Sequence, residues 1–216
     1  MKKTVKNLVL SAAGFVLFAV PLSAREVTIS VGAGQNWKQK MDPQAAIWLE
    51  DSNGNFIKTL YVTGKASKKN WIFGPKEGRP ESLPVWYFAS GTDSQMPQKK
   101  TKEKTELDAV TSATPKGGMI FKAEIPDTDC VIKAEFNTSF DYNETYTKKT
   151  SGVNGQPSVI YSAEISKDAK EEITLEFLGT GSLDGSDGSI SKNTEGLTTA
   201  KSIVRIVTIT LQNQKN

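Results

Sequence analysis

Residues 45–60 read Ala45-Ala46-Ile47-Trp48-Leu49-Glu50-Asp51-Ser52-Asn53-Gly54-Asn55-Phe56-Ile57-Lys58-Thr59-Leu60. Apolar and polar residues alternate on both sides of Asn53-Gly54, as they do in half-buried β-strands. The Asn-Gly dipeptide accepts the positive φ angles of a tight type I′ turn. We therefore predict a β-hairpin that turns at Asn53-Gly54.

Other segments along the chain are also rich in β-branched and aromatic residues, and no segment shows a sustained helical period. Turn residues separate nearly all of these segments. This pattern predicts an all-β fold, an immunoglobulin-like antiparallel β-sandwich. The expected strands are Val27–Val31, Ala45–Glu50, Phe56–Val62, Val85–Phe88, Met119–Ile125, Val131–Asn137, Ser158–Ile165, Ile173–Leu178 and Ile203–Leu211.

The chain begins with a basic segment, an apolar run from Leu8 to Val20, and Pro21-Leu22-Ser23-Ala24. This pattern predicts a cleavable signal peptide over residues 1–24 and a periplasmic or secreted protein. The apolar run is shorter than the roughly 20 residues of a membrane-spanning helix, and no Cys follows it to carry a lipid, so we expect no membrane anchor after cleavage. Residues 25–216 are expected to form one sandwich domain with a polar loop near residues 91–118.

Removal of the signal peptide changes the net charge. The chain has 27 Lys and Arg against 24 Asp and Glu, and residues 1–24 contain three Lys and no acid. The mature chain therefore has 24 of each and a formal charge of zero. A neutral chain gives no electrostatic reason to expect a nucleic-acid partner.

The composition excludes several kinds of chemistry, because the chain has no His and one Cys. A Ser-His-Asp or Cys-His nucleophile, a His-ligated zinc and an iron–sulfur cluster are all excluded. A carboxylate-based hydrolase remains an alternative, although no pair of acids is singled out by its spacing. Cys130 lies in an apolar run, which predicts a buried structural thiol.

Five motifs are spread over the mature chain: Gln44-Ala45-Ala46-Ile47-Trp48-Leu49-Glu50, Leu83-Pro84-Val85-Trp86, Asp108-Ala109-Val110-Thr111-Ser112-Ala113-Thr114-Pro115, Ser151-Gly152-Val153-Asn154-Gly155-Gln156-Pro157-Ser158 and Asp184-Gly185-Ser186-Asp187-Gly188. Taken together, they resemble a bacterial family of predicted periplasmic proteins known only as a domain of unknown function. The resemblance implies location and β architecture and transfers no catalytic residue.

The segment Asp108-Ala109-Val110-Thr111-Ser112-Ala113-Thr114 resembles the flavinylation motif of exported electron-transfer proteins. The resemblance implies that a flavin transferase attaches FMN to Thr114 by a phosphodiester, with Asp108, Thr111, Ser112 and Ala113 forming the motif around it. Ser112 stands where Gly is common, and Pro115 follows the acceptor directly. The favoured alternative is a loop in which Asp, Ser and Thr bond their own backbone.

Asp184 and Asp187 place two carboxylates on a Gly-rich segment that the sequence predicts to be a loop. Such a loop can offer oxygen ligands to Ca²⁺, but the complete twelve-residue calcium loop with its bidentate Glu is missing. An ordinary turn is the favoured interpretation.

Polar loops at the ends of a rigid sandwich can form binding surfaces. On this ground we expect a ligand surface at Asn154, Gln156, Tyr142 and Asn143. The alternative is a tight turn, because Asn154-Gly155 favours positive φ.

Two of the four tryptophans offer a further surface. Trp37 and Trp71 lie in polar surroundings and are expected to be partly exposed, where they would stack on a sugar. Trp48 and Trp86 lie in expected strands and are assigned to the core.

The sequence as a whole favours an exported, non-catalytic binding or accessory protein whose ligand is a protein or small molecule of the cell envelope. No cofactor is the favoured expectation. An FMN-carrying electron-transfer protein and a carboxylate hydrolase are the alternatives.

Overall fold

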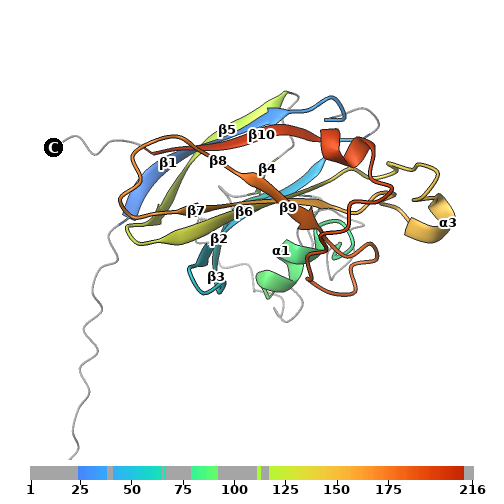
Figure 1. The fold of residues 1–216 in the computed structure, drawn as a ribbon, viewed down its shortest axis with the longest axis horizontal. Coiled ribbons are helices and arrows are strands. Elements are labelled where there is room, and N and C mark those ends of the chain that lie inside the picture. Colours follow the sequence, from blue (N-terminus) through green and yellow to red (C-terminus); the bar gives the residue numbers. More distant parts are fainter. Residues whose placement is uncertain are drawn as a thin grey trace, which may run out of the picture.

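The computed structural model describes residues 24–37, 41–64, 66, 79–91, 111–112 and 117–211. In this part of the chain the strands form two packed sheets, so the predicted all-β sandwich is confirmed (Figure 1). Sheet A has the order β5-β1-β10-β8, from Gly118–Pro126, Ala24–Ala33, Val204–Leu211 and Ile173–Thr174. Sheet B has the order β4-β3-β2-β6-β7-β9, from Thr111–Ser112, Phe56–Thr63, Gln44–Asp51, Cys130–Asn137, Val159–Ile165 and Glu176–Thr180. Neighbouring strands are antiparallel except β3 and β4, which are parallel.

The main core lies between the two sheets and follows from the alternation in the sequence. Val27, Ile29 and Val31 of β1 all point inward, because side chains two residues apart share one face of a strand. Phe136 of β6 packs against Trp37, with ring centroids 6.4 Å apart. Trp37 is therefore buried, and the expectation of partial exposure was wrong. Trp71 lies outside the described residues.

Cys130 is a free, buried thiol, as predicted. Desolvation by burial raises its pKa, which keeps it in the protonated, unreactive form.

The hairpin predicted at Asn53-Gly54 is present between β2 and β3, but its turn is not of type I′. Gly54 has a φ of 83°, whereas Asn53 keeps a negative φ. The Gly54 N–H donates to the Asp51 carbonyl at 3.0 Å, and the Asp51 carboxylate accepts the Asn53 N–H at 2.9 Å. Asp at the first position of a type I turn, followed by Gly at positive φ, gives the three-residue hairpin loop.

Residues 85–88 form a helix and not the predicted strand. α1 spans Pro84–Ala89, with Pro at its first turn, where the fixed φ of proline suits a helix. A run of four apolar residues cannot distinguish a buried strand from a buried helix by its period. α1 lies on the face of sheet B that points away from sheet A (Figure 1). There Val85 and Trp86 share one apolar cluster with Trp48 and Ile160.

The predicted strand Ile173–Leu178 is divided between the two sheets. β8 pairs with β10 in sheet A, and β9 pairs with β7 in sheet B. Leu175, between them, is buried, and its N–H donates to the Val207 carbonyl at 2.9 Å. The chain thus crosses from one sheet to the other at this residue.

The remaining helices of the described residues lie at one end of the sandwich, which we call the α3 end (Figure 1). α3 spans Lys148–Ser151, and the 3-10 helix η1 spans Thr199–Ser202. Of the expected signal peptide only Ala24, the first residue of β1, is among the described residues. Most of the expected polar loop near 91–118 also lies outside them.

Gly181 lies between sheet B and α1, where the neighbouring atoms leave no room for a side chain. A Cβ at this position would lie 2.5 Å from Ser158 Oγ and 2.7 Å from Pro84 Cγ. We expect Gly181→Ala to lower the free energy of unfolding by about 2 kcal/mol through overpacking. Thermal or urea unfolding measures the effect. Gly117→Ala is the matched control, because nothing lies within 4 Å of its Cβ position. Equal stability of the two variants would contradict the tight packing at Gly181.

Candidate ligand-binding site

Two extended segments continue beyond β6 and ahead of β7 and lie side by side at the α3 end. Asp141 and Gly155 form a parallel bridge between them. Gly155 has a φ of 82°, and a Cβ there would lie 2.4 Å from the Asp141 carbonyl oxygen. Only glycine fits this close approach of two backbones.

A buried polar network around Asp141 fixes these segments to the rest of the sandwich. The Asp141 carboxylate accepts hydrogen bonds from Asn36 Nδ2 at 3.2 Å, Gln156 Nε2 at 2.8 Å and Thr199 Oγ1 at 2.7 Å. Gln156 Oε1 also accepts the Thr198 N–H at 2.7 Å. The network joins four distant parts of the chain, so each partner restrains the others.

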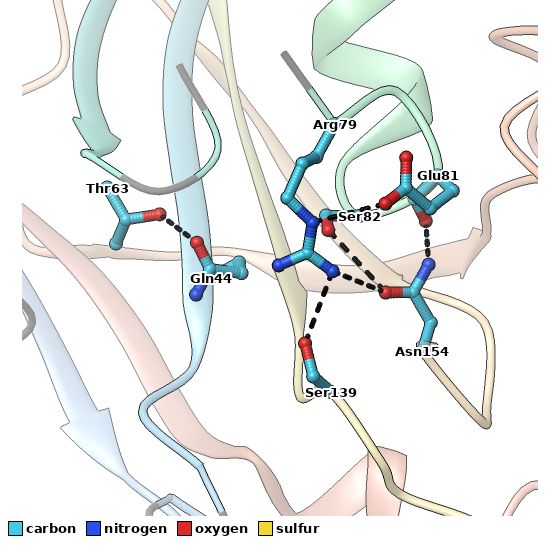
Figure 2. A network of polar contacts seen from close by, with 7 residues as sticks. All are labelled: Gln44, Thr63, Arg79, Glu81, Ser82, Ser139 and Asn154. Carbon is cyan, nitrogen blue, oxygen red and sulfur yellow. Dashed lines mark hydrogen bonds and ion pairs between the residues drawn. The ribbon is translucent and has the colours of Figure 1, made fainter. Parts of the chain in front are cut away.

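A second network, around Arg79, joins the same segments to residues 79–82 (Figure 2). Arg79 Nε donates to Glu81 Oε1 at 3.1 Å, and Nη2 donates to Ser139 Oγ and Asn154 Oδ1, each at 3.4 Å. Asn154 Nδ2 donates to the Glu81 carbonyl, and Asn154 Oδ1 also accepts from Ser82 Oγ at 3.5 Å.

The pair of Gln44 and Thr63, also drawn in Figure 2, joins the start of β2 to the end of β3. Thr63 Oγ1 donates to Gln44 Oε1 at 3.1 Å. Both side chains are buried, and Gln44 pairs with Asn137, the last residue of β6.

Three apolar side chains lie on the outside of this framework. Phe140 and Val153 are 42 % and 47 % exposed, and the Phe140 N–H donates to the Val153 carbonyl at 2.8 Å. The rings of Phe140 and Tyr142 lie 6.4 Å apart at 59°, and the Tyr142 hydroxyl donates to the Gly152 carbonyl at 2.7 Å. We call Phe140, Tyr142 and Val153 the aromatic surface.

Phe140 has a φ of 63°, and no other non-glycine residue among the described ranges has a positive φ. For a residue with a Cβ this backbone region costs about 1 kcal/mol or more. The Asp141 network and the bridge to Gly155 hold the chain in this conformation, so the surrounding structure over-determines it.

The predicted ligand residues come together at the α3 end, but they differ in exposure. Tyr142 and Asn143 are partly exposed, and Asn143 Nδ2 donates to the Gly196 carbonyl at 2.8 Å. Asn154 and Gln156 are each 1 % exposed and belong to the two buried networks. These two side chains therefore support the loops from inside.

Sequence reasoning missed Phe140 and Val153. The only signal at Phe140 is the alternation Ser139-Phe140-Asp141-Tyr142, which is also typical of a strand with its aromatic residues in a core. Tertiary contacts reverse this orientation: the Asp141 side chain points inward to its three partners, and its aromatic neighbours point outward.

The predicted flavinylation segment is described only at Thr111 and Ser112, which form β4. They pair with Val62 and Thr63 at the edge of sheet B. Asp108, Ala113 and the expected acceptor Thr114 lie outside the described residues. FMN attachment stays a prediction.

Asp184 and Asp187 form ordinary turns. Asp184 Oδ1 accepts the Ser186 N–H at 3.0 Å, and Asp187 Oδ1 accepts the Ser189 N–H at 2.8 Å. Hydrogen bonds from the side chain and backbone of Ser186 lower the pKa of Asp184, and those from Ser189 lower the pKa of Asp187. The described residues contain no group of three metal-ligating side chains, and calcium binding stays a prediction.

The hydrolase alternative also stays a prediction. The buried acid with the clearest pKa shift is Glu135, and its hydrogen bonds within the described part come from neutral donors.

Comparisons of the chain with protein families, with curated proteins and with solved structures found no match. None of the helices in the described ranges has the length and apolarity needed to span a membrane.

Proposed function

We propose that the protein is an exported, non-catalytic binding protein and that its ligand contacts the aromatic surface at the α3 end. The observation that carries this proposal is the backbone of Phe140, held at positive φ while its ring stays 42 % exposed. Strained residues of this kind cluster at binding and active sites. The expected signal peptide supports a location outside the cytoplasm.

The composition of the surface favours a partner with apolar or aromatic groups. Phe140 and Val153 have no polar side-chain atom, and the Tyr142 hydroxyl donates to the Gly152 carbonyl. Aromatic side chains on a rigid base bind with a small loss of conformational entropy. The buried Asp141 network supplies that rigid base.

The binding surface can be tested by photocrosslinking in the host cell. Replacing Val153 by p-benzoylphenylalanine puts a photoreactive group beside Phe140 and leaves the Phe140 side chain intact. We expect a discrete crosslinked product at Val153 and none at Ile57, an equally exposed position on β3.

The matched variant has the same photoreactive group at Val153 and also Phe140→Asn. This change removes the ring, and Asn tolerates positive φ. We expect it to fold normally and to lose the product. The same product at Val153 and Ile57, or one that persists in the Phe140→Asn variant, would refute the aromatic surface as the binding site. The intact mass of the same preparation tests export, through the loss of residues 1–24.

A further inference from the structure

Glu135 is an acidic residue buried in an otherwise apolar cluster. It lies in the middle of β6, paired with Ala46 of β2 and Ile160 of β7, and is 0 % exposed. Its side chain points to the outer face of sheet B, the face that α1 covers. Ala46 and Ile160 belong to the apolar cluster that packs against Val85 and Trp86.

The hydrogen bonds of Glu135 come from α1 and from the start of β7. Oε2 accepts the Trp86 N–H at 2.8 Å, and Oε1 accepts the Val85 N–H at 3.3 Å and the Ser158 hydroxyl at 2.6 Å. The carboxyl group therefore satisfies two N–H groups at the start of α1, which a helix cannot satisfy internally. α1 has no side-chain cap of its own.

No cation among the described residues forms an ion pair with Glu135. Lys133 of β6 pairs with Glu50 of β2, with Nζ 2.7 Å from Oε2, and Arg79 pairs with Glu81. The other titratable side chains on β2, β6, β7 and residues 79–91 are Glu50, Asp51, Cys130, Lys133, Tyr161, Glu164, Arg79, Glu81 and Tyr87. Desolvation raises the pKa of Glu135 to about 7, against the lowering effect of its three hydrogen bonds.

Residues 79–91, which we call the strap, are attached to the sandwich by polar and apolar contacts. One polar contact is at Glu135, Ser82 and Glu81 contact Asn154, and Arg79 Nη2 donates to Ser139 Oγ and Asn154 Oδ1. Trp86 Nε1 also donates to Thr59 Oγ1 at 2.9 Å. Leu83, Val85 and Trp86 add apolar packing to these polar contacts.

We propose that Glu135 is a proton-dependent latch that holds the strap on sheet B when protonated and releases it when ionised. The protonated carboxyl can donate to Ser158 Oγ while its other oxygen accepts the Trp86 N–H. When the carboxyl loses its proton to solvent, the charge remains in an apolar cluster where the described residues place no cation, and opening of the strap brings water to it. Opening also breaks the strap contacts of Asn154, which follows Val153 of the aromatic surface. The latch itself does not depend on the binding role.

Hydrogen exchange followed by mass spectrometry tests the latch on the full mature chain. After correction for intrinsic rates, we expect the opening constant of the α1 amides to rise on the order of a hundredfold from pH 5 to pH 8, as the difference between an ordinary and a raised Glu pKa implies. In Glu135→Gln, whose amide cannot ionise, the same constant should change by only a few-fold.

Amides of β6 near Ile132 provide the internal reference. The β6 amides should exchange more slowly than the α1 amides, because they become accessible only when the sheet itself opens. If α1 and β6 amides have the same opening constant at each pH, the strap opens only together with the whole fold and the latch is refuted. A wild-type α1 opening constant that does not change with pH refutes it as well, and this measurement needs no variant.

Discussion

Asp141→Ala will lower the free energy of unfolding by roughly 3 kcal/mol, because two buried amides and the half-buried Thr199 hydroxyl lose their carboxylate acceptor. Asn36, Gln156 and Thr199 all donate to this carboxylate from separate parts of the chain. Asp141 is 3 % exposed, so water cannot replace the lost acceptor without opening the network. Urea unfolding followed by circular dichroism measures the loss.

The same variant is expected to weaken ligand contact at the α3 end, since Asp141 lies between Phe140 and Tyr142. In the photocrosslinking assay, a folded Asp141→Ala protein should give less product at Val153. Asp168→Ala is the matched control, because its carboxylate is exposed and its one ion pair within the described ranges is with neighbouring Lys167 at 3.8 Å. If both variants unfold at the same urea concentration, the Asp141 network does not stabilise the fold as described.

Much of the fold could be predicted because alternation along a strand directly reflects burial on one face. Val27, Ile29 and Val31 are an example, and their strand is found in full. The hairpin at Asn53-Gly54 could also be predicted from the local sequence. The type of its turn was predicted wrongly, because the Asp51 side chain accepts the Asn53 N–H and so favours a negative φ at Asn53.

The errors fall where tertiary contacts decide between similar local patterns. Residues 85–88 were predicted as a strand, yet they form a helix. The N–H groups of Val85 and Trp86 at the start of this helix donate to Glu135, which is distant in the sequence. The Ile173–Leu178 prediction missed the crossing at Leu175, since strands in either sheet can have the same alternation.

The candidate site could be predicted only in part, because tertiary contacts also decide which of its residues are exposed. Polar residues such as Asn154 and Gln156 suggest a surface, but here they satisfy a buried framework. The exposed residue is an aromatic, Phe140, whose unusual φ is imposed by contacts of Asp141 and Gly155. No local propensity predicts a Phe at positive φ.

Glu135 also makes the stability of the whole protein depend on pH. Its pKa is raised from 4.5 to about 7 in the folded state, so the folded protein holds a proton that the unfolded chain has released in this range. The stabilisation is fully present below about pH 4.5 and is lost as the pH rises to about 7. The loss amounts to about 3 kcal/mol, from the free energy equivalent of each pKa unit.

Comparison with Glu135→Gln isolates this contribution, because all other titrating groups are shared. The Gln side chain can accept the Trp86 N–H and donate to Ser158 Oγ, as the protonated Glu does, and it has no charge to desolvate. We expect the two proteins to be nearly equally stable near pH 4.5 and the Gln variant to be about 3 kcal/mol more stable at pH 8. The measurement is the difference between their urea unfolding free energies across this range. A difference that stays constant with pH would mean that Glu135 is ionised in the folded protein throughout, and that water or a cation reaches it under the strap.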